Sequence, residues 1–304
     1  MTNQTPFFSV VIPTYNRAKL IPATLESVFS QTYTDYEIIV VDNCSTDNTE
    51  EILKPLVAAG KIKYIRHEKN YERARSRNTG MENARGEFLT LLDSDDFMYE
   101  SCLADAAEFA EKNPDARCFH NLYELVNDEK EVIYRYQFPP LNNQIKAIAA
   151  GNFMACIGNF ICRDVYTKYR FDTFQDLIGA EDWDFWLRVL ADNKVSRIEK
   201  VNCGILNHEN RSIKSNHFES LERGYEYLLK KFRADEHLME IYGKYINRIE
   251  ANSYLYLATV ANTIALFSHA RRFLNIARQK DSSVVFTFRF LNTCRRAFLK
   301  LQIK

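Results

Sequence analysis

Short apolar runs alternate with helical segments over the first third of the chain, and this alternation constrains the fold more than any other feature. The runs are Phe7–Ile12, Glu37–Val41, Ile62–Ile65 and Phe88–Leu92, and the helical segments are Ala18–Gln31, Asp47–Ala58, Arg73–Ala84 and Ser101–Lys112. Near-continuous apolar runs of this length are typical of strands covered on both faces. We therefore predict an α/β fold with a mostly parallel sheet and right-handed crossovers.

Polar residues end three of these runs, at Thr14–Arg17, at Asp42-Asn43 and at Asp93–Asp96. Because the carboxyl ends of parallel strands meet at one edge of a sheet, these residues are expected to converge there, where α/β sheets bind ligands. The simpler alternative is that polar residues merely terminate strands. Asp42 could accept hydrogen bonds from a nucleobase or ribose, or could only initiate a turn with Asn43.

The segment LLDSDDF, Leu91–Phe97, carries three carboxylates within four residues. Packed carboxylates repel one another and need a cation or a proton to coexist. Mg²⁺ or Mn²⁺, with diphosphate oxygens as further ligands, is the natural counter-charge. The alternative is a polar turn in which Asp96 caps the next helix. No glycine-rich phosphate loop is present, so metal and side chains would have to balance phosphate charge.

A second acidic group, Glu181-Asp182-Trp183-Asp184, opens a predicted helix at Asp182–Ala191. The helix dipole favours Asp182 as an anion, and Trp183 offers a flat surface on which a sugar could stack. Capping and core packing are the alternative roles. His208 could ligate a metal or be a surface histidine. Arg77 could contact phosphate or belong to a solvated helix face.

Together these segments resemble glycosyltransferase family 2, whose members are inverting enzymes of the GT-A fold. The resemblance runs from SVVIPTYNR (Ser9–Arg17) through IIVVDNCSTDNTEEIL, LLDSDD and EDWDFWLR to the segment of His208, and covers residues 7 to about 215. It implies a GT-A (Rossmann-like), mostly parallel mixed sheet flanked by helices. The expected domains are a catalytic domain at 1–215, with a nucleotide-binding half at about 1–115 and an acceptor half at about 116–215, and a C-terminal helical extension at 216–304.

The resemblance also implies roles for single residues. Asp182 would be the general base, and Glu181 and Trp183 would contact the acceptor. The metal ligands would be Asp93, Asp95 and His208. The residues expected to contact the nucleotide sugar are Pro13, Thr14, Tyr15, Asn16, Arg17, Asp42, Asn70, Arg77, Asp93 and Ser94. One departure concerns the local backbone, because many relatives have N-x-G where this chain has Asn70-Tyr71-Glu72.

The expected reaction moves a sugar, with inversion, from a nucleotide diphosphate sugar, UDP by default, to a glycan or lipid-linked acceptor in cell-envelope synthesis. The alternatives are a nucleotidyltransferase, whose glycine- and lysine-rich loop is replaced here by PTYNR, and a silent sugar- or membrane-binding scaffold. Equal numbers of basic and acidic residues, 40 each, speak against a nucleic-acid partner. Seven scattered cysteines suggest neither zinc nor a disulfide framework.

No signal peptide or membrane span is visible, so a cytoplasmic enzyme is expected. The tail Val284–Lys304 contains five basic residues and no acidic one. On a helix, Arg289, Arg296, Lys300 and Lys304 would form one side, largely opposite Phe290, Leu291, Ala297, Phe298 and Leu301. This helix could dock peripherally on the inner face of the membrane, or pack on its own domain or on a second subunit in a homo-oligomer.

Overall fold

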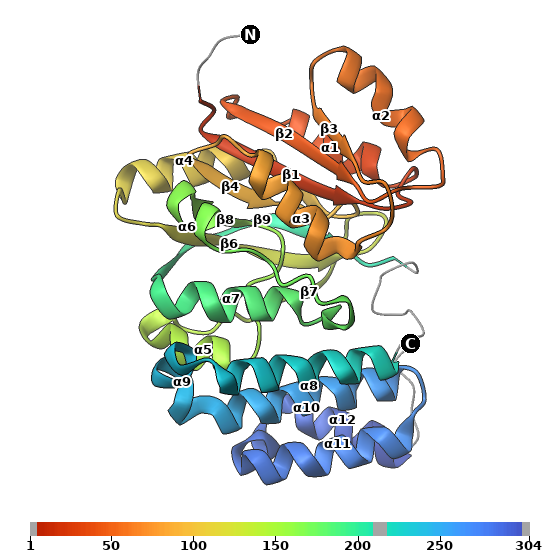
Figure 1. Ribbon diagram of the computed structural model, residues 1–304, viewed down its shortest axis with the longest axis vertical. Helices are drawn as coiled ribbons and strands as arrows, with labels where there is room; N and C mark the ends of the chain where they lie inside the picture. Colours follow the sequence, from red (N-terminus) through yellow and green to blue (C-terminus); the bar gives the residue numbers. More distant parts are fainter. Residues whose placement is uncertain (1–4, 209–217, 300–304) are drawn as a thin grey trace. The chain divides into compact units, whose positions relative to one another are not determined.

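The computed structural model describes residues 5–208 and 218–299 (Figure 1). Their contacts separate two compact units. The sheet unit comprises 5–141, 154–173 and 188–208, and the helical unit comprises 142–153, 174–187 and 218–299. The assignment of residues 1–215 and 216–304 to separate domains stays a prediction.

The four predicted strands form one parallel half of a nine-stranded sheet. They are β1 (Phe8–Thr14), β2 (Tyr36–Asp42), β3 (Lys63–Arg66) and β4 (Phe88–Leu91). Thr14 pairs with Asp42, and Asp42 pairs with Arg66, so these three strands end level with one another. The polar residues that follow β1, β2 and β4 therefore gather at one edge of the sheet.

The other half of the sheet makes it mixed. Its strands are β5 (Phe97–Met98), β6 (Cys118–Val126), β7 (Val132–Arg135), β8 (Asn159–Cys162) and β9 (Val195–Leu206). The strand order is β3-β2-β1-β4-β8-β6-β9-β5, with β7 paired antiparallel to β6 as a hairpin. The α/β fold class and the mixed, mostly parallel sheet are confirmed.

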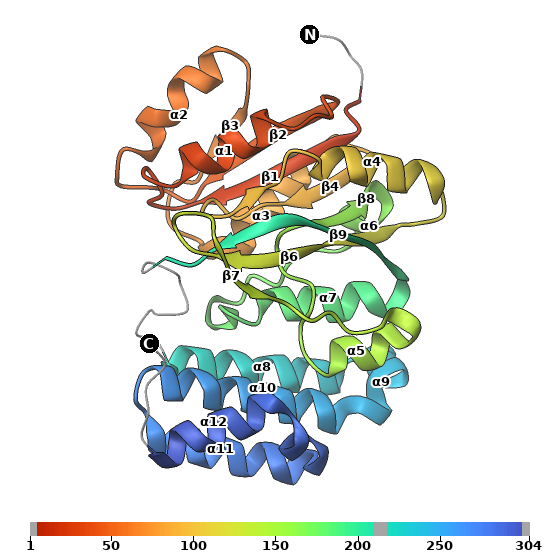
Figure 2. The same ribbon diagram turned by 180° about the vertical axis from the view of Figure 1, so that it is seen from behind.

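Helices cover both faces of this sheet (Figures 1 and 2). On one face lie α1 (Ile21–Phe29) and α4 (Cys102–Lys112), on the other α3 (Glu72–Asn83) and α6 (Arg163–Lys168), and α2 (Thr49–Ala58) contacts β3. α3 approaches β1 so closely that a Cβ at Gly80 would lie 2.1 Å from Cγ1 of Val11. Only glycine permits this contact, which positions α3 beside the polar sheet edge.

The helical unit is built around a long central helix, α10 (Ile246–Thr263), which contacts α8, α11 and α12. Its other elements are η1 (Leu141–Asn143, from its second residue), α5 (Gln144–Ala149), η2 (Gln175–Leu177), the start of α7 (Glu181–Asp192), α8 (Phe218–Ala234), α9 (Glu236–Tyr242), η4 (Gly243–Tyr245), α11 (Phe267–Lys280), η5 (Ser282–Phe286) and α12 (Phe288–Leu299). The predicted C-terminal helices are confirmed. Within the described ranges, no helix is both long and apolar enough to span a bilayer.

Candidate active site

The loop after β1 is tied to the loop after β2 through Asn16. Its Oδ1 accepts a hydrogen bond from Thr46 N at 2.8 Å, and its own backbone N donates to Ser45 Oγ at 2.9 Å. Asn16 has a φ of 51°, a left-handed conformation that asparagine tolerates better than most residues. Pro13 and Thr14 are buried beneath the loop, whereas Tyr15 is 41% exposed. These two hydrogen bonds thus fix the loop against the loop after β2, with Tyr15 at its surface.

Asp42 is fully buried at the end of β2. One carboxylate oxygen accepts from Ser45 N at 2.9 Å and the other from the Tyr64 hydroxyl at 2.6 Å, with Arg66 Nε 3.6 Å away. Burial, reinforced by this hydrogen bond, raises the pKa of Tyr64. Asp42 therefore stabilises the turn that follows β2, and its contact with a nucleoside stays a prediction. Tyr64 and Ser45 hold the Asp42 carboxylate in place, but no pattern in the sequence indicates that they do so.

Asn70 and Glu72 form the segment that departs from the family pattern. Asn70 Oδ1 accepts from Asn43 Nδ2 at 2.6 Å and from Glu72 N at 3.0 Å. Glu72 has a φ of 71°, the left-handed region in which glycine is unstrained. The backbone thus adopts at Glu72 the conformation that suits a glycine, despite the side chain.

Arg77 and Asp93 form an ion pair at the sheet edge, with Arg77 NH2 3.0 Å from Asp93 Oδ1. The Arg77 side chain is 2% exposed, and its guanidinium lies over the ring of Phe171 at 5.3 Å. Arg77 is therefore not part of a solvated helix face. Ser94, the next residue after Asp93, is also buried.

Asp95 lies between two nitrogen-bearing side chains. Its Oδ2 is 3.2 Å from NH2 of Arg17 and 2.9 Å from Nε2 of His208. Asp96 secures this arrangement, because its Oδ1 accepts from Leu206 N at 3.0 Å and so fixes the end of β9, two residues before His208. Two of the three predicted metal ligands, Asp95 and His208, are brought together, while Asp93 faces Arg77.

The donor atoms at Asp95 suit a divalent cation. A carboxylate oxygen and an imidazole nitrogen are both ligands that Mn²⁺ accepts. Among the residues that the structure describes, no three His, Cys, Asp or Glu side chains gather as a complete metal site. A cation held by Asp95 and His208 would need water and diphosphate oxygens as its other ligands, which is usual for Mg²⁺-type sites.

Asp182 belongs to the helical unit, in the first turn of α7. Its Oδ1 accepts from Trp183 N at 2.8 Å. Glu181 is buried and accepts from Gly179 N at 2.6 Å, and Trp183 is 4% exposed with its indole N–H donating to Ile148 O at 2.9 Å. Glu181 and Trp183 thus have local structural roles, and their acceptor contacts stay predictions.

The loop that leads into α7 is clamped by α8. Asp176 accepts hydrogen bonds from Ser220 Oγ at 2.6 Å and from Arg223 Nε at 2.8 Å, and Arg223 and Ser220 lower the pKa of Asp176. A Cβ at Gly224 would lie 2.0 Å from Asp176 O, so the backbones are in direct contact. These contacts fix the backbone shortly before Asp182.

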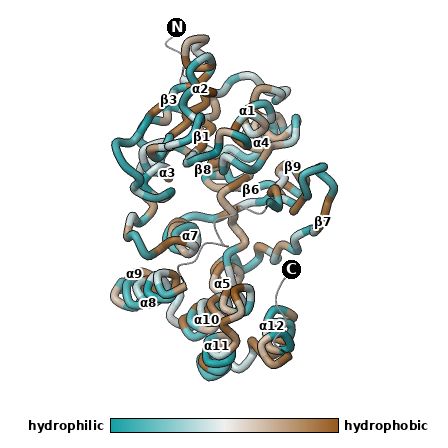
Figure 3. The backbone as a smooth tube through the Cα atoms, turned by 90° about the vertical axis from the view of Figure 1, so that its right-hand side faces the viewer, coloured by the Kyte–Doolittle hydropathy of each residue, from teal (hydrophilic) through white to brown (hydrophobic). Residues whose placement is uncertain are grey.

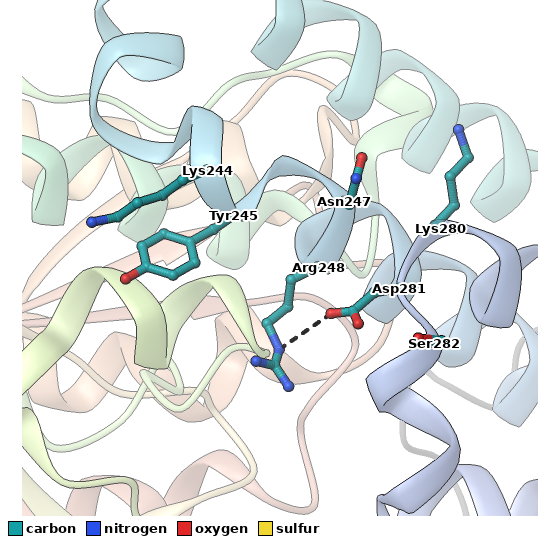
Figure 4. A pocket seen from close by; sticks show the side chains of 7 residues that line it. All are labelled: Lys244, Tyr245, Asn247, Arg248, Lys280, Asp281 and Ser282. Carbon is teal, nitrogen blue, oxygen red and sulfur yellow. Dashed lines mark ion pairs between the residues drawn. The ribbon is translucent and has the colours of Figure 1, made fainter.

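A cavity of about 360 Å³ lies elsewhere in the helical unit (Figure 4). It is lined by Lys244, Tyr245, Asn247, Arg248, Lys280, Asp281 and Ser282. Arg248 is paired with Asp281 at 3.8 Å, and Lys280 with Glu250 at 2.7 Å. Because two of its three cations are neutralised within the unit, the cavity has little unbalanced charge with which to hold an anion.

The chain is similar in sequence to characterised sugar transferases. It is 30% identical over 228 residues to UDP-Glc:alpha-D-GlcNAc-diphosphoundecaprenol beta-1,3-glucosyltransferase WfgD of Escherichia coli, covering 72% of this chain and 84% of that protein. The fold is similar to that of S. aureus TarS 1-349 in complex with UDP-GlcNAc, with a TM-score of 0.64 and 20% identity over 97% of this chain and 92% of that one.

A second solved structure has the same fold. The mannosyltransferase PcManGT from Pyrobaculum calidifontis, in complex with GDP-Man and Mn2+, gives a TM-score of 0.61 at 16% identity, covering 98% of this chain and 88% of that one. The family model of Glycosyl transferase family 2 matches residues 9–178, more than half of the chain. The match includes β1 from Ser9 onward, β2 and the acidic loop after β4, and the chain therefore belongs to glycosyl transferase family 2 and is a glycosyltransferase.

Proposed function

We propose that the protein transfers a sugar from a UDP-sugar to a hydroxyl of a lipid-linked or glycan acceptor in cell-envelope polysaccharide synthesis, with inversion at the anomeric carbon. The observation that carries the proposal is the pairing of Asp95 with His208 at the carboxyl edge of the sheet. The E. coli relative, which is named for UDP-Glc and a diphosphoundecaprenol-linked sugar, supports both the donor and the acceptor class.

The proposed donor site uses the residues gathered at the sheet edge. Asp42, at the carboxyl end of β2, would bind the nucleoside. Arg17 and Arg77 carry positive charge beside Asp95 and Asp93, and so could compensate the diphosphate in place of a glycine-rich loop. Asp95 and His208 would hold Mn²⁺ or Mg²⁺, which when bound neutralises charge on the departing nucleoside diphosphate. The Mn2+ named with the P. calidifontis mannosyltransferase supports a divalent cation.

Asp182 is proposed as the general base. The helix dipole favours negative charge on a carboxylate in the first turn of a helix. Asp182 would take the proton of the acceptor hydroxyl as that oxygen attacks, and orientation of the two substrates would supply much of the remaining rate. A single displacement inverts the anomeric centre, and no second carboxylate is singled out as a covalent nucleophile.

The test is nucleoside diphosphate release from a panel of UDP-, dTDP- and GDP-sugars by purified protein with Mn²⁺, with and without a diphosphoprenol-linked sugar. We expect release with a UDP-sugar that rises with acceptor and disappears with a chelator. NMR of the product reports the anomeric configuration. Turnover that is fastest with a GDP- or dTDP-sugar would refute the UDP assignment, and a product that retains the donor's configuration would refute inversion.

A further inference from the structure

The most exposed large hydrophobic side chains of the described chain are concentrated in one short stretch. They are Phe286 at 86%, Phe288 at 83%, Phe298 at 65%, Leu299 at 62% and Leu291 at 57%. All five belong to η5 and α12, and every other exposed large hydrophobic side chain among the described residues is less accessible. Water contact of this much aromatic and aliphatic surface is unfavourable, so a cluster of this kind marks an interaction surface.

α12 is firmly attached to the helical unit by its opposite face. Thr293 and Ala297 are buried, Asn262 Nδ2 donates to Thr293 O at 2.8 Å, and Arg271 NH1 donates to Ala297 O at 3.0 Å. Ala297, predicted to lie on the apolar side of the helix with Leu291 and Phe298, is buried against the protein, whereas those two side chains are exposed. Lys300, Leu301 and Lys304 lie outside the described residues.

The outward face of α12 combines apolar side chains with a cation. Phe288, Leu291, Phe298 and Leu299 recur at intervals of three, seven and one residues, which places them on one side of the helix. Arg295 lies four residues after Leu291 and is exposed on that same side. The helix accordingly shows hydrophobic and hydrophilic colours in alternation along its turns (Figure 3). We call this set of five residues, together with Phe286, the α12 face.

The net charge of this segment indicates which kind of partner the α12 face would bind. Residues 282–299 contain three arginines, Arg289, Arg295 and Arg296, and no acidic residue. A twofold contact between two copies would bring the arginines of one face against those of the other, which is unfavourable. An anionic lipid surface instead offers negative headgroups to the arginines and an acyl boundary to the aromatic rings.

We propose that the α12 face is a peripheral membrane-docking surface specific for anionic phospholipids. The phenylalanine and leucine side chains enter the boundary between headgroups and acyl chains, while Arg295 and its neighbours bind headgroup phosphates. The face needs no folding step on binding, because the opposite side of α12 already packs on the unit. This surface would bring a lipid-linked acceptor and the enzyme to the same plane, but its membrane binding does not depend on any catalytic residue.

The experiment is co-sedimentation of the full chain with vesicles of phosphatidylglycerol and phosphatidylcholine, compared with pure phosphatidylcholine, without donor or metal. We expect binding to the anionic vesicles that weakens as salt is raised. The triple change Phe288→Ser, Leu291→Ser, Phe298→Ser should abolish binding, and Arg295→Glu should weaken it about tenfold. Because these side chains are exposed, the variants should fold, which circular dichroism would verify.

The matched control is Ile133→Ser with Tyr134→Ser on β7, where the side chains are 50% and 53% exposed. This variant should bind vesicles as the unchanged protein does. Equal binding by the α12 variants, no binding to anionic vesicles at low salt, or equal binding to neutral vesicles would overturn the proposal. A concentration-dependent dimer that the α12 variants lose, seen by analytical ultracentrifugation, would instead assign the face to a second copy.

Discussion

His208 Nε2 lies 2.9 Å from Oδ2 of Asp95, although the two residues are 113 positions apart in the chain. Arg17 approaches the same oxygen at 3.2 Å. In this arrangement the guanidinium balances the charge of Asp95, so the carboxylate is already compensated before a cation binds. A cation at this site must therefore share Asp95 with Arg17 or replace it, and the diphosphate is the natural new partner for the arginine.

Asp95→Ala is expected to lower turnover by at least about 100-fold and to weaken Mn²⁺ binding in the presence of UDP. The side chains of the Arg17–Asp95 pair are only 19% and 18% exposed, so loss of the pair should cost about 1–3 kcal/mol of stability. Mn²⁺ binding is measured by electron paramagnetic resonance and stability by urea unfolding. Asp115→Asn, at an exposed turn position, is the control and should change neither. Normal turnover of Asp95→Ala at limiting Mn²⁺ would remove Asp95 from the metal site.

Asp182→Asn is expected to reduce kcat by about 10²- to 10⁴-fold while leaving nucleotide affinity unchanged. The amide keeps the shape of the carboxylate and can still accept a hydrogen bond from Trp183 N, but it cannot take a proton. Calorimetric titration with UDP, beside initial rates, separates binding from chemistry. A parallel loss of UDP affinity would indicate that Asp182 supports the donor site instead of acting as the base.

Substitution of Glu72 tests whether the missing glycine strains the backbone. Because Glu72 has a φ of 71°, Glu72→Gly should be more stable than Glu72→Ala by about 1 kcal/mol. At Arg75, an exposed position within α3, the order should reverse, since alanine is the better helix former by about 1 kcal/mol. Urea unfolding of the four variants gives both differences. The same order at both positions would contradict strain at Glu72.

Three strands of the parallel half, β1, β2 and β4, were predictable because they are apolar runs that the fold buries almost throughout. The fourth, β3, has the sequence KYIR with Lys63 and Arg66 exposed, and its apolar signal is accordingly weaker. The twelve-residue strand β9 was not predicted, since Arg197, Glu199 and Lys200 interrupt its apolar pattern and several of its residues are exposed. Its position nevertheless determines where His208 lies. A local pattern thus identifies a strand most readily when its apolar run is uninterrupted by charged residues.

The candidate site was predictable as a set of residues but not as a set of partners. The sequence shows that Asp95 lies in an acidic segment just after a strand and that His208 is a candidate ligand. Their contact is supported by the hydrogen bond between Asp96 and Leu206, which the sequence does not show. Likewise the residue pattern of α3 is compatible with a solvent-exposed Arg77, whereas in the structure Arg77 is buried against Asp93 and Phe171. Such long-range pairings are set by sheet register and packing, which a local pattern does not encode.

Acid should destabilise the protein through His120, a buried residue of β6 that is 1% exposed. Burial, with a smaller contribution from Arg197, lowers the pKa of His120 to about 4, against the hydrogen bond to Asn121 O and the charge of Glu199, which raise it. Because the unfolded state then binds more protons than the folded state, the contribution of His120 is fully present above about pH 6.5 and is lost as pH falls toward 4.

Between pH 7 and pH 5, this linkage should remove about 2 kcal/mol from the free energy of unfolding. His120→Gln cannot titrate, so its unfolding free energy should fall by about 2 kcal/mol less over the same range, whatever its stability at pH 7. His237→Gln, at an exposed position of α9, is the control and should keep the slope of the unchanged protein. Urea titrations at pH 7, 6 and 5 measure the three slopes. Parallel slopes for His120→Gln and the unchanged protein would mean that His120 is protonated in the folded state or already reached by water, and that acid acts through other groups.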